Sequence, residues 1–148
     1  MKVLSKLQNS VEVNGTSFIL LIDPDKKNND KIDKLVEHAN MNGVDAIFVG
    51  GSLMMDSLYH DRIERIKSIS NVPLVLFPGA INQINRHFDA MLFMSLLSGR
   101  NPHYLIGEQV LAAPIVKDIG VETIPTGYVL IDGGSSTTVE FVSGTRPL

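Results

Sequence analysis

The sequence predicts an α/β protein built on a parallel sheet, made of about the first five βα units of a (βα)8 barrel of the TIM type. Apolar runs and helical patterns alternate along the 148 residues, and this alternation is typical of parallel strands joined by crossover helices. Five of the apolar runs end in short clusters of Gly, Pro, Asp, Ser or Thr. In α/β enzymes the carboxyl ends of the strands carry the active-site loops. The clusters therefore indicate the edge of the sheet at which chemistry is expected.

The first half of the chain gives clear signals for each element. Residues 1–8 place apolar side chains at helical spacing, and Asn28-Asn29-Asp30 is suited to cap a helix over 31–42. A helix over 56–68 is expected to turn Leu58, Ile63 and Ile66 toward the sheet. Its charged side chains are expected to face solvent; they are Asp61, Arg62, Glu64, Arg65 and Lys67. The expected strands of this half are 17–22, 46–49 and 74–77.

The second half is less regular. A helical turn is expected at 81–85 and a strand at 90–93. A helix over 103–117 opens after Asn101-Pro102, and Pro114 is expected to kink or shorten it. The fifth strand covers 122–124 and resumes at 128–131, and the β-branched stretch 137–142 is expected to return as a strand in a small hairpin.

Two architectures fit this order of elements. Five strands in 148 residues are enough for a doubly wound, flavodoxin-like domain, or they are the start of a barrel, which typically takes about 250 residues. The last residues, Ser143-Gly144-Thr145-Arg146-Pro147-Leu148, resemble a loop and provide no closing helix. This ending favours the barrel, with residues 1–148 as the N-terminal part of a single barrel domain.

Composition limits the function. With 44% hydrophobic and 20% charged residues, no cysteine and a net charge of −3, the chain is expected to be a globular cytoplasmic protein without disulfides. The acidic balance argues against a nucleic-acid partner. No apolar stretch approaches the roughly 20 residues of a membrane span.

Candidate metal ligands follow the first two strands. Asp23-Pro24-Asp25-Lys26 places carboxylates beyond the first strand, and Gly50-Gly51-Ser52 follows the second. Mg²⁺ takes one or two carboxylates and leaves positions for water and substrate phosphate. Each motif alone is equally compatible with a capped or solvated turn. Because neighbouring strands carry them, Asp23 and Ser52 are expected to face one metal ion.

Two further loops supply candidate substrate contacts. Ser98-Gly99-Arg100-Asn101-Pro102 offers a guanidinium and small donors for a phosphate, although Arg100 paired with a surface acid is an equal alternative. Tyr128 places a phenol near the end of the fifth strand, where it contacts substrate or simply packs. Met91 and Met94 fill core gaps or line an apolar channel.

Read together, five segments resemble the geranylgeranylglyceryl phosphate synthase family, which includes the heptaprenylglyceryl phosphate synthases. The segments are LLIDPDK (20–26), FVGGS (48–52), PLVLFPG (73–79), LFMSLLSGRNP (92–102) and IPTGY (124–128). The resemblance implies a (βα)8 barrel that uses Mg²⁺ to transfer a polyprenyl group from its diphosphate to the 3-hydroxyl of sn-glycerol 1-phosphate, a step of ether-lipid synthesis. It also implies that Asp23 and Ser52 hold the metal. Arg100 and Tyr128 remain candidates for phosphate and pocket contacts.

This chain lacks segments that the resemblance implies for the family. The family continues into a sixth strand with a Tyr-Leu-Glu motif and later glycine-rich loops that hold the glycerol phosphate, so catalytic residues are expected beyond Leu148. A five-stranded part of a barrel leaves open edges. We therefore expect the isolated chain to be a fragment or to self-associate as a homo-oligomer, and to be poorly active alone.

Two other functions remain open. One is a non-catalytic, doubly wound module that binds a phosphorylated ligand. The other is a different phosphate-handling barrel enzyme, such as an aldolase or an isomerase. Lys26 is the only near candidate for a Schiff base at a strand end, which counts against an aldolase.

Overall fold

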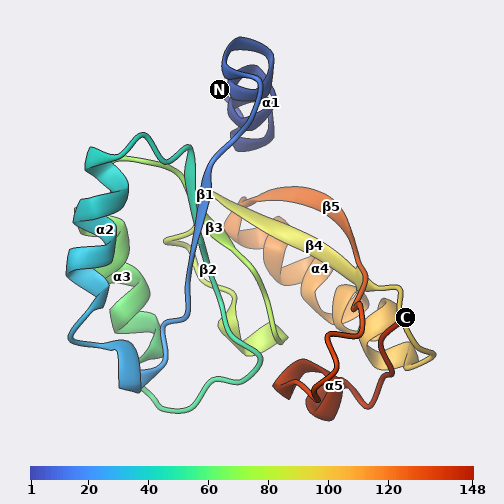
Figure 1. Ribbon diagram of the computed structural model, residues 1–148. Helices are drawn as coiled ribbons and strands as arrows, with labels where there is room; N and C mark the ends of the chain where they lie inside the picture. The colour runs from blue at the N-terminus through green and yellow to red at the C-terminus, as the bar shows by residue number, and fades with distance from the viewer.

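The computed structural model describes residues 1–148 and contains one sheet of five parallel strands. The strands lie in the sheet in chain order, each paired with the next (Figure 1). They are β1 (Ile19–Ile22), β2 (Ala46–Val49), β3 (Leu74–Leu76), β4 (Ala90–Leu96) and β5 (Glu122–Tyr128). A flavodoxin-like sheet has the order 2-1-3-4-5. The doubly wound alternative is therefore wrong, and the sequential order is that of a barrel wall.

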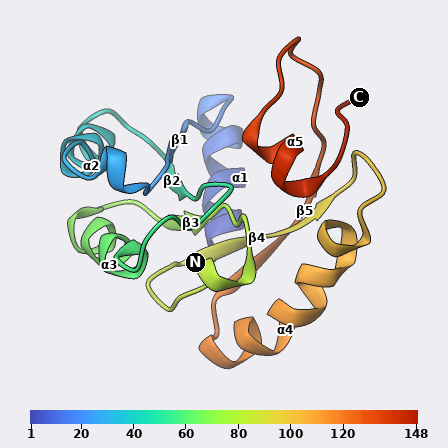
Figure 2. The same cartoon turned by 90° about the horizontal axis from the view of Figure 1, so that it is seen from below.

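The main helices pack on one side of this curved sheet. Figure 2 shows α2, α3 and α4 on that side, and α1 and α5 on the other. The helices are α1 (Val3–Asn14), α2 (Ile32–Met41), α3 (Tyr59–Ile69), α4 (Glu108–Ile119) and α5 (Thr138–Ser143). None of them is long and apolar enough to cross a membrane. No α-helix lies between β3 and β4, where the chain forms only the short 3₁₀ turn η2 (Ile81–Gln83).

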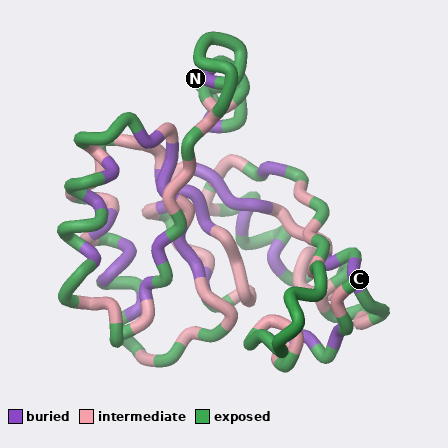
Figure 3. The backbone as a smooth tube through the Cα atoms, viewed as in Figure 1, coloured by how far each residue is buried: buried purple, intermediate pink, exposed green.

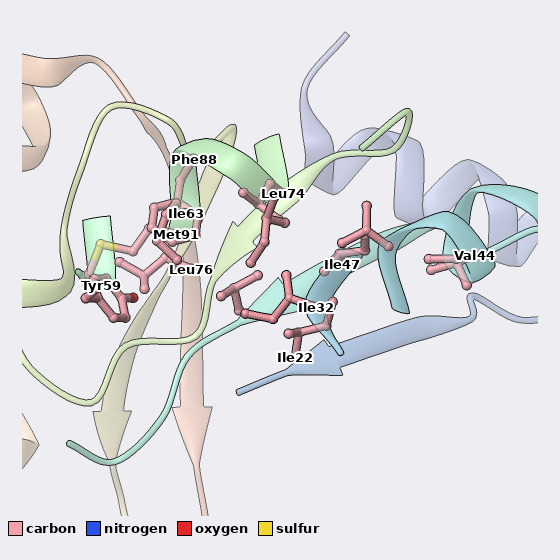
Figure 4. Packing of buried hydrophobic residues seen from close by; sticks show 14 of the residues in the cluster. Ile22, Ile32, Val44, Ile47, Tyr59, Ile63, Leu74, Leu76, Phe88 and Met91 are labelled. Atoms are coloured by element: carbon pink, nitrogen blue, oxygen red, sulfur yellow. The ribbon is translucent and has the colours of Figure 1, made fainter. Parts of the chain in front are cut away.

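The core has two layers, one on each face of the sheet. Ile22, Ile47 and Leu74 belong to the layer that packs against α2, α3 and α4 (Figure 4). A second, smaller cluster on the opposite face includes Val75 and Leu92. Strands that are apolar on both faces are typical of parallel sheets. Figure 3 shows the burial concentrated in the sheet and on the helix faces toward it.

The sheet is open, as expected. β1 and β5 are its edge strands, and large apolar side chains at β1, such as those of Phe18 and Leu21, are 55% and 56% exposed. Unpaired strand edges and exposed apolar side chains favour association with another chain or segment. Self-association stays a prediction.

The end of the chain differs from the sequence-based prediction. Residues 137–142 do not form a strand, because Thr138–Ser143 is the helix α5. Its N-terminus carries a capping box, in which the Thr137 hydroxyl accepts from the Glu140 amide and the Glu140 carboxylate accepts from the Thr137 amide. These two hydrogen bonds satisfy amides that a helix start otherwise leaves free. The Thr-x-x-Glu spacing was the signal, and it outweighs the β-branched composition.

Two other elements also differ. β5 is one continuous strand that ends at Tyr128, so the predicted interruption and the resumed strand at 128–131 are wrong. An edge strand tolerates Pro125, since one side of its backbone has no partner strand. α4 continues through Pro114 to Ile119, so the proline does not shorten it, and the predicted first turns form a π-helix, η3 (His103–Gly107).

The side chain of the first residue of β5 caps the first helix, α1. The Glu122 carboxylate of β5 accepts hydrogen bonds from the backbone amides of Val3 at 2.6 Å and Leu4 at 3.2 Å. Val3 is buried against the sheet. A carboxylate at a helix N-terminus satisfies free amides and interacts favourably with the helix dipole. Glu122 therefore attaches α1 to the beginning of the sheet.

We expect Glu122→Ala to lower the free energy of unfolding by about 0.5–2 kcal/mol, the usual cost of losing a helix N-cap. Urea unfolding followed by circular dichroism measures this change. Glu12→Ala is the control, because Glu12 lies on α1, the helix that Glu122 caps, and its side chain is exposed. Equal unfolding midpoints for the two variants would contradict the assigned role of Glu122.

Candidate functional site

The pairing of β1 with β2 brings two polar loops together. Ile22 is the register partner of Val49, and the Gly50 amide donates to the Ile22 carbonyl at 3.2 Å. An ideal Cβ placed on Gly51 would lie 2.9 Å from Asp23 Oδ1. The Asp23 carboxylate therefore lies directly against the backbone of the loop that carries Ser52.

The Asp23 carboxylate is only partly engaged within the protein. Its Oδ1 accepts from the Asp25 amide at 3.1 Å, and its Oδ2 lies 3.9 Å from Lys27 Nζ. The side chain is 45% exposed, so it keeps acceptor positions for a ligand. Tyr59 is buried nearby, and its hydroxyl has no hydrogen-bond partner. Burial, and to a smaller extent the charge of Asp23, raises the pKa of Tyr59 above its ordinary range.

The donor set suits a magnesium ion that is shared with a substrate. No group of three or more His, Cys, Asp or Glu side chains is arranged to hold a metal, so no cage made of protein ligands alone exists. Mg²⁺ usually binds through one or two carboxylates plus waters and substrate phosphates. One accessible carboxylate, Asp23, beside the hydroxyl-bearing loop of Ser52 fits that pattern.

Arg62 is buried, contrary to the prediction that it faces solvent. It is 5% exposed. Its Nε donates to the Pro24 carbonyl at 2.6 Å and its Nη2 donates to Asp56 Oδ1 at 2.7 Å. The hydrogen bond from Arg62 holds the pKa of Asp56 below its ordinary value. Leu58, which was predicted to face the sheet, is 55% exposed instead, because α3 begins later, at Tyr59.

The loops after β2 and β3 are packed backbone against backbone. An ideal Cβ on Gly50 would lie 1.7 Å from the Phe77 carbonyl oxygen, and one on Gly79 would lie 2.4 Å from the Gly51 carbonyl oxygen. Gln83, which is fully buried, donates to the Gly51 carbonyl at 2.8 Å and accepts from the Gly79 amide at 2.7 Å. Sequence reasoning missed Gln83, because a single glutamine in a short turn has no recognisable pattern.

An apolar cavity of about 260 Å³ opens beside these loops. Fourteen of its 22 lining residues are hydrophobic. It extends from the carboxyl ends of the strands toward η2 and α4, in the space where no helix covers the β3–β4 connection. Met91 and Met94 both line it, and Met91 also belongs to the buried core cluster, so both alternatives for these methionines stay open. Other lining residues are Gly51, Ser52, Phe77, Ile81, Ile84, Tyr104, Ala112 and Tyr128.

Polar side chains of α4 fix the far wall of the cavity. The Glu108 carboxylate accepts from the Ile81 amide at 2.8 Å, and Gln109 donates to the Met94 carbonyl and to the Ser95 hydroxyl. These contacts attach α4 to η2 and to β4. No sequence pattern indicated the role of Glu108 or of Gln109, since both depend on segments that are distant along the chain.

The two predicted substrate contacts lie in different surroundings. Tyr128 lines the cavity, and its ring packs edge-on against Phe77 with 5.6 Å between the centroids. Arg100 is exposed, does not line the cavity and forms no ion pair. Small residues of its loop contact the end of the chain instead, since Asn101 donates to the Ser143 carbonyl. A phosphate contact by Arg100 stays a prediction.

We expect Gly50→Ala to destabilise the protein strongly, by about 1–3 kcal/mol or more, because the new methyl group overlaps the Phe77 carbonyl in a packed region. Gly133→Ala is the matched control, because an ideal Cβ on Gly133 meets no atom within 4 Å. Chemical unfolding of both variants measures the difference. A Gly50→Ala protein as stable as Gly133→Ala would show that the loops are not closely packed.

Known proteins have similar sequences and a similar fold. A model described as the PcrB family matches residues 11–146. A geranylgeranylglyceryl phosphate synthase of Chitinophaga pinensis is 48% identical over 132 residues, which cover 89% of this chain and 52% of the relative. The synthase of the same name from Flavobacterium johnsoniae is 43% identical over 151 residues, covering 99% of this chain and 62% of the relative. The chain thus spans about half the length of the curated relatives it matches.

A solved structure agrees with the sequence comparison. The crystal structure of (S)-3-O-geranylgeranylglyceryl phosphate synthase from Thermoplasma acidophilum, in complex with its substrate sn-glycerol-1-phosphate, superimposes with a TM-score of 0.89 and 35% identity. The match covers 100% of this chain and 59% of that chain. The similarity confirms the predicted barrel-type fold and the predicted resemblance. Since the family model matches nearly the whole sequence, the chain belongs to the PcrB family.

Proposed function

We propose that this chain provides the prenyl diphosphate site of a Mg²⁺-dependent prenyltransferase that acts on sn-glycerol 1-phosphate. One observation carries the proposal: a mainly apolar cavity opens at Ser52, next to the partly exposed Asp23 carboxylate. A polyprenyl diphosphate joins a long hydrocarbon to a polyanion. The cavity suits the hydrocarbon, and the rim with Asp23 and Ser52 suits a metal-bound diphosphate.

In the proposed reaction the allylic carbon–oxygen bond of the prenyl diphosphate breaks, and a new ether bond forms to the 3-hydroxyl of the glycerol phosphate. Diphosphate leaves with the bonding electron pair, and the hydroxyl proton passes to a general base. Asp23 and Ser52 would hold Mg²⁺, which neutralises diphosphate oxygens and so stabilises the leaving group. Met91, Met94 and Tyr128 enclose the prenyl chain and exclude water from the breaking bond.

The relatives support the assignment of the substrates. The synthases named above are called geranylgeranylglyceryl phosphate synthases, and the Thermoplasma acidophilum enzyme binds sn-glycerol-1-phosphate. The cytoplasmic location, the homo-oligomeric state and the poor activity of this chain alone stay predictions.

We expect Asp23→Asn to weaken Mg²⁺-dependent binding of geranylgeranyl diphosphate by more than about 100-fold, since outer partners of a metal ligand alone account for roughly 10- to 100-fold. Isothermal titration calorimetry with and without Mg²⁺ measures the change. In the full active site the same substitution should abolish prenyl transfer.

Asp25→Asn is the matched control for this experiment. Asp25 lies two residues away and accepts from the Lys27 amide at 2.9 Å, a role that the asparagine side-chain oxygen also performs. Its affinity should remain close to that of the wild type. Binding that does not depend on Mg²⁺, or that survives Asp23→Asn unchanged, would exclude the proposed metal site.

The cavity is tested separately by Ala112→Leu. Ala112 is buried on α4 and lines the cavity, so a larger side chain there should lower the affinity for geranylgeranyl diphosphate about tenfold. Inorganic pyrophosphate, which has no tail, should bind as before. Ala113→Leu places the same side chain on the exposed side of the helix and serves as control. An equal loss for both ligands would mean that the cavity does not hold the prenyl chain.

A further inference from the structure

Arg62 connects the two loops that carry the proposed metal ligands. Its guanidinium comes from the first turns of α3 and donates to the Pro24 carbonyl, next to Asp23, and to Asp56 Oδ1, in the loop that begins with Gly50-Gly51-Ser52. Asp56 Oδ1 also accepts from the Leu58 amide at 2.9 Å. The loop after β1 and the loop after β2 are thus held by one buried side chain.

The main effect of this arrangement is on geometry. Burying a guanidinium is costly unless it is paired, and even a paired buried charge adds little stability compared with an apolar residue of similar size. The planar fork of arginine, however, fixes the direction and the separation of the groups that it binds. Here the groups are a backbone carbonyl on the loop after β1 and a carboxylate on the loop after β2.

The loop after β1 and the loop after β2 also meet next to the cavity, at Asp23 and Gly51. Asp23 Oδ1 lies close to the Gly51 backbone, and Ser52 follows directly. Arg62 is 5% exposed, does not line the cavity and donates its hydrogen bonds to the Pro24 carbonyl and to Asp56. It is therefore placed to act on Asp23 and Ser52 through the backbone and not through the ligand.

We propose that Arg62 is a positioning residue: by joining Pro24 to Asp56 it sets the separation of Asp23 and Ser52 that a Mg²⁺-bound diphosphate requires. This inference rests on the proposed function, because it assumes that Asp23 and Ser52 bind one metal ion. No substrate contact is assigned to Arg62.

The affinity for Mg²⁺ and inorganic pyrophosphate, measured by calorimetry, tests this role. Arg62→Met retains the apolar length of the side chain but loses both hydrogen bonds, and we expect binding to weaken by about 10- to 100-fold. Arg62→Lys keeps the charge but not the fork, and should also bind weakly. Arg62→Met with wild-type affinity would overturn the proposal.

Lys67→Met is the matched control. Lys67 lies on the same helix and pairs with Asp89 at 2.6 Å, but Asp89 accepts from the Leu74 amide, at the opposite end of the sheet from the site. Its loss should lower stability without changing pyrophosphate affinity by more than about twofold. If Lys67→Met weakened binding as much as Arg62→Met, the effect would be one of general stability, and the positioning role would be wrong.

Hydrogen exchange separates this inference from the proposed function. In Arg62→Met, amides of residues 22–28 and 50–58 should both exchange about tenfold faster or more, whether or not any metal binds. If wild-type protein bound no Mg²⁺-pyrophosphate, the proposed function would fail, yet coupled loop exchange would still support the connection by Arg62. Unchanged exchange in either loop would overturn it. Asp56→Asn, a milder substitution, replaces Arg62→Met in both assays if the latter does not fold.

Discussion

The register between β1 and β2 is the constraint on which the rest of the site depends. Ile22 pairs with Val49, so Asp23 and Gly50 leave the sheet side by side. A slip of one residue would turn every side chain of β1 to the other face. Ile22 is almost fully buried on the helix-facing side, and moving it into solvent would be costly. Burial of this strand therefore also fixes the place of the Asp23 carboxylate.

The short connection between β3 and β4 has a comparable consequence for the cavity. A regular barrel unit covers each pair of strands with a helix, but here η2 is only a 3₁₀ turn. Met91 and Phe93 of β4 consequently face a cavity bounded by η2 and α4. The apolar space lies beside this short connection, α5 adds Val139 and Val142 to its wall, and the glycine-rich loops at its mouth supply the polar end.

The sequence predicted the order of the elements and the loops of the site because both depend on local patterns. Apolar runs followed by Asp23 or by Gly50-Gly51-Ser52 locate strand ends directly. Arg62 shows the limit of this reasoning. Helical periodicity predicted that its side chain faces solvent with the other charged residues of α3. In the structure the side chain is buried, and the Pro24 carbonyl and the Asp56 carboxylate accept its hydrogen bonds. The strand predicted at 137–142 failed for a different reason, since composition was given more weight than the Thr137–Glu140 capping pair.

Side-chain hydrogen bonds connect the rim of the site from β1 to β4. Arg62 joins the first loop to the second, Gln83 joins the second to the third, and Glu108 and Gln109 attach α4 to η2 and β4. Three of these bonds, from Arg62 to Pro24, from Gln83 to Gly51 and from Ile81 to Glu108, link segments 27 to 38 residues apart in the sequence. A site held in this way has little freedom to rearrange when a ligand arrives, and binding energy is then not consumed in ordering loops. As a consequence, the affinity of the proposed site for its ligand depends on buried residues, such as Arg62 and Gln83, to which no ligand contact is assigned.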